Sequence, residues 1–359
     1  MKKALSVLLC FLLLLPAGCG RKSLYTKYSY EFLNTFDTVV QVMGYTRTKE
    51  EFDGWAKKAE ARFVELNALF DQYTNYEGVN NIKTINDNAG KEPVAVDSAI
   101  IELLQFCKDW QAKTPESVNV AMGAALLLWH DYRTKGIDDP EQAELPPMDE
   151  LRGAAAHSDI GKVVVDAGKG TVFLEDPELR LDVGSIAKGY ATEVVARELI
   201  AAGWKSFIIN SGGNVRAVGG PLDGERTKWG VGLTDPDDPG EIAGTGSLLD
   251  TAYVAGLSVT TAGDYQRYYT VDGTRYHHII DPKTLMPATQ FRSVSVVTES
   301  SAVSDFIDTV LFILPYDKGL AYIQGLGNVE AMWVLPDGSV KATDGMKGML
   351  KNLGGATAK

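Results

Sequence analysis

VAGLSVTTAGDYQRYYTVDGTRYHHIIDPKTLMP, the stretch from Val254 to Pro287, has the pattern of a β-hairpin. Aromatic and β-branched residues stand on both sides of the Asp-Gly pair at positions 272–273, and such a pair between two strand-like runs is a strong signal for a two-residue turn. Side chains alternate along a strand, so His277 and His278 are predicted to lie on opposite faces. Only one of the two histidines can therefore face a site.

Several short runs in this stretch follow one known pattern, at positions 258–259, 263–265, 267–268, 272–273, 275–276 and 278–282. The pattern resembles the signature of the ApbE-type FAD:protein FMN transferases. Two positions depart from it, since Ala262 stands where the family usually has serine and Leu285 where it usually has glycine. Leucine resists the positive φ that glycine adopts freely, which puts the geometry of the loop after residue 284 in question.

The composition is that of an ordinary globular protein. The chain has 359 residues, of which 45% are hydrophobic and 23% are charged, and this length allows one large domain or two. Its formal net charge is −12 at pH 7, whereas a nucleic-acid surface needs clustered lysine and arginine. We therefore expect no nucleic-acid partner.

The N-terminus has the layout of a secretory signal. Two lysines precede an apolar run at positions 4–15, which is too short to span a bilayer as a helix. The run leads through small residues to Cys19 and resembles a bacterial lipoprotein box, which implies lipid on Cys19. We expect a signal peptide at 1–18, a membrane tether at 19–30 and the folded domain at 31–359, anchored by lipid to the extracytoplasmic face of the cell membrane. A plain cleaved signal with an incidental Cys19 is the alternative.

Strand and helix patterns organise the first third of the domain. A strand is predicted at 36–43, ended by Gly44. A capping box at 48–51 begins a helix whose apolar residues recur at helical spacing and which is expected to end near Tyr73. A second helix is predicted at 97–112.

The sequence LDVGSIAKGYA at 181–191 predicts a strand that passes through a glycine turn into a helix. It follows short predicted strands within 163–183. Free backbone amides at a helix N-terminus favour a phosphate, and Lys188 in the first turn could join such an anion site. Taken alone this pattern is weak, and a surface lysine is the commoner explanation.

A strand at 293–298 and a helix from about Ser301 are predicted near the C-terminal end. The apolar residues of this helix share one stripe, whereas Asp305 and Thr309, one turn apart, lie together on another face. Two oxygen ligands at this spacing suit a hard ion such as Mg²⁺, which needs few protein ligands when a diphosphate supplies others. From the residues alone, a solvated polar face is the alternative.

The resemblance covers residues 36 to about 312 and implies an α+β fold, a single domain of mixed, largely antiparallel sheet flanked by helices. It implies that Mg²⁺ is bound by Asp305, Thr309 and the backbone carbonyl of Ser185. It also implies a set of contacts to FAD, namely Phe36, Tyr73, Ser117, Val118, Asn119, Asp182, Lys188 and Ile279.

The reaction that the resemblance implies splits the diphosphate of FAD and attaches FMN through a phosphoester to a threonine or serine of an exported or membrane acceptor protein, releasing AMP. We expect His278, with a pKa near neutral, to remove the proton of the acceptor hydroxyl, and His277 to face outward. The family's usual acceptors carry a D-G-x-S/T-G-A/S-S/T run. Two alternatives remain open: an Mg²⁺-dependent FAD pyrophosphatase that yields FMN and AMP, and a flavin-binding lipoprotein without catalysis.

Overall fold

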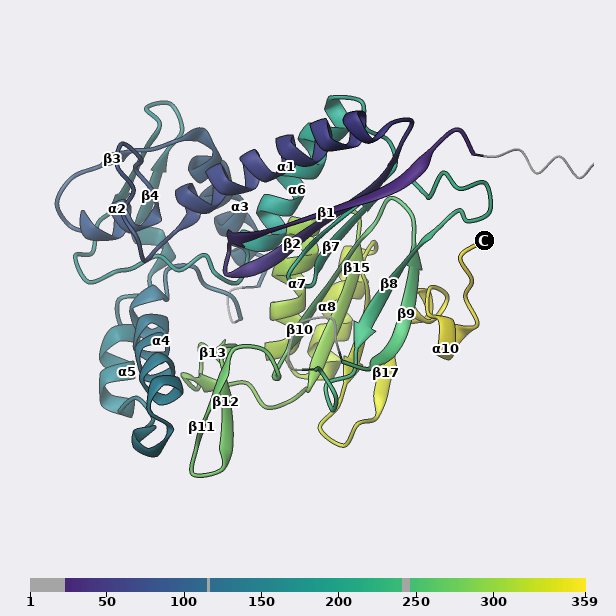
Figure 1. Cartoon of the computed structure of the whole chain (residues 1–359). Coiled ribbons are helices and arrows are strands. Elements are labelled where there is room, and N and C mark those ends of the chain that lie inside the picture. Colours follow the sequence, from purple (N-terminus) through teal and green to yellow (C-terminus); the bar gives the residue numbers. More distant parts are fainter. Residues whose placement is uncertain (1–22, 115–116, 241–245) are drawn as a thin grey trace, which may run out of the picture.

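An eight-stranded sheet runs through the centre of the protein (Figure 1). The computed structural model describes residues 23–114, 117–240 and 246–359. All neighbouring strands of this sheet are antiparallel, which confirms the α+β class. In sheet order the strands are β1 (Thr26–Thr35), β2 (Thr38–Thr46), β6 (Phe207–Ser211), β7 (Asn214–Val218), β10 (Ser258–Gly263), β15 (Ser293–Thr298), β16 (Glu330–Val334) and β17 (Val340–Ala342).

Helices cover one face of the sheet, and a hairpin covers the other (Figure 1). The alternation along β6 shows the division, because Phe207 and Ile209 enter the helix-side core whereas Ile208 enters the core under the hairpin. The helices are α1 (Lys49–Phe70), α3 (Ser98–Gln111), α6 (Ala187–Ala201), α7 (Ser301–Ile313) and α8 (Tyr316–Leu326), and the hairpin is β8 (Trp229–Thr234) with β9 (Leu248–Val254), flanked by α9 (Asp344–Lys347) and α10 (Lys351–Gly354). No helix in the described part of the chain is long and apolar enough to cross a membrane.

A third, smaller core joins α4 (Gly123–Asp138) and α5 (Met148–Ala155) to the hairpin of β11 (Tyr268–Val271) and β12 (Thr274–His277). The predicted hairpin and its Asp-Gly turn are confirmed, since Val271 pairs with Thr274. The remaining short elements are α2 (Ile82–Asp87), η1 (Pro140–Gln142), η2 (Ile160–Lys162), β3 (Val94–Ala95), β4 (Val163–Asp166), β5 (Thr171–Leu174), β13 (Ile280–Asp281) and β14 (Met286–Pro287). The strands predicted within 163–183 are confirmed as β4 and β5, but 179–183 forms only an isolated bridge at Arg180.

The start of the domain differs from the prediction. Strand β1 begins at Thr26 and pairs with β2, so the part of the expected tether from 26 to 30 belongs to the sheet. The predicted signal peptide and Cys19 lie outside the described residues. Phe36 and Asp37 form the β1–β2 turn with φ of 53° and 52°, and β2 continues past Gly44. A Cβ at Gly44 would lie 2.2 Å from the Trp204 ring, so this glycine permits close packing and does not end the strand.

The loop at Leu285 keeps a positive φ although its residue is leucine. Its φ is 59°, its amide donates to the Asp281 carbonyl at 2.8 Å, and its own carbonyl accepts from Trp129 Nε1 at 3.0 Å. The side chain is buried in the third core. Burial and these two hydrogen bonds therefore stabilise a backbone conformation that leucine disfavours by roughly 1–2 kcal/mol.

This strain predicts an unusual order of stability at position 285. Leu285→Ala is expected to lose about 2–5 kcal/mol because it empties a buried site. Leu285→Gly empties the same site but relieves the positive φ, so it should be no less stable than the alanine variant and up to about 1 kcal/mol more stable. Denaturant unfolding of both variants measures the difference.

The matched control is Leu151, which is buried in the same core but lies in helix α5. There glycine should be less stable than alanine by about 1 kcal/mol. The account of the loop is wrong if Leu285→Gly shows the same penalty relative to alanine as Leu151→Gly.

Candidate active site

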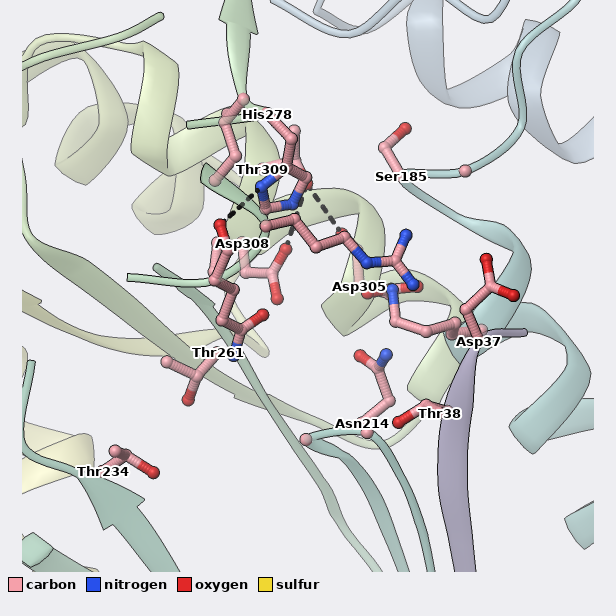
Figure 2. A pocket seen from close by; sticks show the side chains of 18 of the residues that line it. Asp37, Thr38, Ser185, Asn214, Thr234, Thr261, His278, Asp305, Asp308 and Thr309 are labelled. Atoms are coloured by element: carbon pink, nitrogen blue, oxygen red, sulfur yellow. Dashed lines mark hydrogen bonds between the residues drawn. The ribbon is translucent and has the colours of Figure 1, made fainter. Parts of the chain in front are cut away.

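A cavity of about 950 Å³ opens between the β8–β9 hairpin, the ends of the central strands and helices α4, α6 and α7. Its volume is near the upper end of the range for small-molecule sites, about 300–1,000 Å³. Figure 2 shows part of its lining. Of the residues singled out from the sequence, those that line it are Tyr73, Ser117, Val118, Asn119, Asp182, Ser185, Lys188, His278, Ile279, Asp305 and Thr309.

Phe36 is the exception. Its ring packs in the core against Phe63 and Phe70, with centroid distances of 6.4 Å to each, because the β1–β2 turn directs it toward α1. Its backbone carbonyl accepts a hydrogen bond from Arg267 Nη2 at 3.2 Å. The Phe36 side chain therefore does not line the cavity, whereas its backbone binds an arginine that does, and its contact with FAD stays a prediction.

One wall of the cavity is a pair of stacked rings. Tyr73 follows α1 and stacks on His130 of α4, with ring centroids 4.6 Å apart and planes at 25°. Burial, with the nearby Asp182 charge, raises the pKa of Tyr73 to about 12, so its hydroxyl stays protonated. The stack offers a flat, uncharged surface against which an aromatic ligand can lie.

The loop at 117–119 is held by its own side chains. Asn119 Nδ2 donates to the Ser158 carbonyl at 2.7 Å, and its Oδ1 accepts from the Ala121 amide at 2.9 Å. Ser117 is buried and donates to the Thr114 carbonyl. These bonds tie the loop to neighbouring segments and fix the shape of this part of the wall.

At the N-terminus of α6, where the sequence predicts an anion site, three of the backbone amides are already used within the protein. The amides of Ile186 and Ala187 both donate to the Val183 carbonyl, at 3.0 and 2.8 Å. The Gly189 amide donates to Asp305 Oδ2 at 2.7 Å. A Cβ at Gly189 would lie 2.3 Å from the Asp305 Cβ, so glycine lets α7 approach until its carboxylate takes the place expected for a phosphate.

The polar face of α7 is buried, so the alternative of a solvated face is wrong. Asp305 is 5% exposed and Asp308 is 3% exposed. Burial raises the pKa of both carboxyl groups, and the Asp305 charge raises that of Asp308 further. Thr309 Oγ1 donates to Asp308 Oδ1 at 3.2 Å. Two adjacent buried carboxyl groups are costly to ionise together unless a cation compensates them.

These groups fit a hard cation. Across the described ranges no backbone or side-chain group donates to the Ser185 carbonyl, because the Gly189 amide that would bond it in a regular helix turns to Asp305. Ser185, Asp305 and Thr309 all line the cavity, and Figure 2 shows their side chains. The Ser185 carbonyl, the Asp305 carboxylate and the Thr309 hydroxyl are oxygen ligands of the types that Mg²⁺ prefers. No group of three His, Cys, Asp or Glu residues that could hold a metal occurs in the part of the chain described.

His278 lines the cavity and His277 does not, but His277 is buried and does not face outward as expected. Its Nε2 donates to the Ala288 carbonyl at 2.7 Å, and its Nδ1 accepts from the Ile279 amide at 3.2 Å. The chain after His278 folds back over this side, and the ring packs on Phe312. Both ring nitrogens are used, so His277 is a neutral packing residue.

His278 lines the cavity in a defined tautomer. Its Nδ1 lies 3.2 Å from the Gln266 carbonyl, which can only accept, so Nδ1 carries the proton and Nε2 is left as an acceptor. Burial, followed by the positive charge of Arg267, holds the pKa of His278 well below its ordinary value, and Lys188 and Arg133 act in the same direction. The expected near-neutral pKa is therefore wrong, and the imidazole is uncharged at neutral pH.

Two arginines of the cavity were missed from the sequence. Arg133 of α4 and Arg267 before β11 both line it. Arg133 Nη2 lies 3.1 Å from His130 Nδ1 and Arg267 donates to the Phe36 carbonyl, and within the described residues neither pairs with a carboxylate. Arg267 lies within the matched family pattern and has a strained φ of 44°. Arg133 carries no signal in the sequence, because only the packing of α4 against the hairpin brings it there.

Comparison with known proteins agrees with this geometry. The sequence model of the ApbE family matches residues 36–333. A Treponema pallidum protein named FAD:protein FMN transferase is 30% identical over 95% of this chain and 93% of its own. A Klebsiella pneumoniae protein of the same name is 31% identical over 77% and 82%.

Solved structures share the fold. The ApbE protein of Thermotoga maritima has a TM-score of 0.77 at 24% identity, covering 90% of this chain and 99% of that one. The flavin transferase ApbE of Vibrio cholerae has a TM-score of 0.74 at 21% identity, over 90% and 99%. The extent of the family match and the relatives at 30% identity or more show that this chain belongs to the ApbE family.

Proposed function

We propose that this protein is an FAD:protein FMN transferase, which moves FMN from FAD to a threonine or serine hydroxyl of an acceptor protein and releases AMP. The observation that carries the proposal is a single cavity in which an uncharged imidazole, unpaired cations and buried oxygen ligands meet. The relatives at 30 and 31% identity bear the name of this activity.

His278 is the proposed base. The acceptor oxygen attacks the phosphorus of the FMN half, its proton passes to His278 Nε2, and the bond from that phosphorus to the AMP oxygen breaks, so that AMP leaves with the electron pair. The Gln266 carbonyl orients the ring by holding Nδ1–H. Nearby cations lower the basicity of His278, and an anionic diphosphate bound among them would restore it.

Arg133, Arg267 and Lys188 are proposed to hold the diphosphate. They come from three separate elements, line one cavity and act together on the pKa of His278. Arg133 and Arg267 repel each other, and burial with this repulsion lowers the pKa of Arg133. Like charges held close without a counterion favour the binding of an anion.

Mg²⁺ is proposed to bind at Asp305, Thr309 and the Ser185 carbonyl, with Asp308 beside them. When bound, it would neutralise charge that builds up on the phosphates. The remaining proposed FAD contacts are the Tyr73 ring, the loop at 117–119, Asp182 and Ile279, all of which line the cavity.

We also propose that Cys19 carries lipid and anchors the enzyme on the extracytoplasmic face of the cell membrane, where an acceptor with a D-G-x-S/T-G-A/S-S/T run would meet it. The signal-like N-terminus and the small residues before Cys19 support this. Intact mass of the protein extracted from membranes, compared with a Cys19→Ser variant, tests the anchor.

The activity is tested by incubating purified protein with FAD, Mg²⁺ and a candidate acceptor, and measuring the acceptor's mass and free FMN. We expect the acceptor to gain the mass of FMN less one water, with AMP released in equal amount. Free FMN without labelled acceptor would mean that water is the acceptor and the protein is a pyrophosphatase. Bound FAD with no AMP released over hours would exclude both enzymes.

His278→Ala is expected to leave FAD affinity largely intact and to lower transfer by roughly 10²–10⁴-fold, the usual contribution of a positioned base. Flavin fluorescence measures binding, and acceptor mass measures transfer. His157→Ala is the control, because His157 does not line the cavity and pairs with Asp176. Normal flavinylation by the His278 variant would remove it from the mechanism.

Arg133→Ala is expected to weaken FAD binding by roughly 10- to 150-fold, because a charged hydrogen bond contributes roughly 1.5–3 kcal/mol. Binding of riboflavin, which has no phosphate, should be unchanged. Titration of each ligand in EDTA, where no turnover interferes, provides both constants. Equal losses for FAD and riboflavin would show that Arg133 supports the wall of the cavity and does not bind phosphate.

A further inference from the structure

Helices α6 and α7 are joined by two reciprocal bonds between a carboxylate and a backbone amide. Asp305 of α7 accepts from the Gly189 amide at 2.7 Å. One turn away, Glu193 of α6 accepts from the Ser301 amide at 2.8 Å with Oε2. The first bond involves Asp305, which lines the cavity, whereas Glu193 and Ser301 of the second bond do not line it. The two bonds together fix the position of α7 along the axis of α6.

Glu193 supplies the N-terminal cap that α7 lacks. The N-cap residue Ser300 makes no side-chain capping bond, and among the residues described the buried hydroxyls of Ser300 and Ser301 have no partner. An N-terminal amide of a helix left unpaired in the interior is costly, and a negative charge there is favourable. Glu193 meets both requirements from a neighbouring helix.

The nearly buried guanidinium of Arg216 holds Glu193 in place. The Glu193 side chain is 7% exposed, and it accepts from Arg216 Nε at 3.3 Å, where the Arg216 side chain is 11% exposed. Its other oxygen accepts from Arg197 Nε at 2.8 Å, and Arg197 is 71% exposed. Arg216 lies two residues after Asn214 and therefore on the same face of β7, and Asn214 lines the cavity with Asp305 (Figure 2).

Helices α6 and α7 pack too closely at Gly189 to admit a side chain there. A Cβ at Gly189 would lie 2.3 Å from the Asp305 Cβ and 2.5 Å from the Ser301 carbonyl oxygen. A shift of α7 along α6 would therefore move the Asp305 carboxylate relative to the Ser185 carbonyl. Mg²⁺ demands near-ideal octahedral geometry, so a small shift of one ligand lowers affinity.

We propose that Glu193 is a positioning residue for the cation site: by capping α7 from α6, it holds Asp305 where one carboxylate oxygen accepts from Gly189 and the other is available to Mg²⁺. The inference rests on the proposed function, since that function supplies the reason for a cation. Glu193 itself touches neither substrate nor the metal cation, and its ion pair with Arg216 holds the carboxylate in place.

The test uses Mn²⁺ as the probe, followed by electron paramagnetic resonance with the full chain in FAD and without acceptor. Asp305→Ala should abolish the bound signal and so identify the site. Glu193→Ala should weaken Mn²⁺ binding at least about tenfold, whereas FAD affinity in EDTA stays unchanged. Glu193→Gln should recover most of the affinity, because its amide oxygen can still accept from Ser301.

Two further variants separate positioning from general stability. Arg197→Ala removes only the exposed partner of the same carboxylate and should bind Mn²⁺ like the wild type. Ser301→Pro removes the amide that Glu193 binds, at a first helical position where proline is tolerated, and should weaken Mn²⁺ binding even if Glu193→Ala does not fold.

The inference is overturned if Glu193→Ala or Ser301→Pro loses thermal stability but binds Mn²⁺ with wild-type affinity, or if the glutamine variant is as impaired as alanine. It is also overturned if the wild type binds no Mn²⁺. A different result would separate the two proposals. If the wild type binds Mn²⁺ and the variants lose this binding as described, but the wild type transfers no FMN to an acceptor, the proposed function is rejected and the positioning role of Glu193 stands.

Discussion

The hydrogen bond between the Gly189 amide and the Asp305 carboxylate is the constraint on which the site depends. It requires a glycine in the first turn of α6, because any side chain there would collide with α7. It also turns that amide away from the Ser185 carbonyl, which is left without a donor within the described chain. One contact between two helices therefore buries a carboxylate, releases a carbonyl and brings both to the wall of the cavity.

Within the described chain, the basic and the acidic groups of the cavity both lack full compensating charges, which a bound ligand and its cation would supply. Burial, together with the charges of Arg267, Lys188 and Arg133, lowers the pKa of His278, while burial raises the pKa of Asp305 and Asp308. Each group is thus pushed toward its neutral form. A diphosphate with its counter-cation would oppose both effects, because the anion compensates the basic side chains and the cation compensates the acids.

The parts of the site that the sequence predicts are those encoded locally. The Asp-Gly turn defines the hairpin that carries His278, and the one-turn spacing of Asp305 and Thr309 places both on one face of α7. The parts it does not predict depend on contacts between distant segments. The burial of His277 needs the chain near Ala288 to fold back, and Arg133 reaches the cavity only through the packing of α4.

The use of the Gly189 amide at the start of α6 is not predicted for the same reason, since nothing near Gly189 indicates that Asp305, more than a hundred residues later, takes it. The most direct measurement of the central claim is anomalous diffraction from crystals grown with FAD and Mn²⁺. The account predicts a peak at coordination distance, about 2.0–2.3 Å, from both an Asp305 carboxylate oxygen and the Ser185 carbonyl oxygen. A peak bound elsewhere in the cavity, with these two oxygens unliganded, would contradict it.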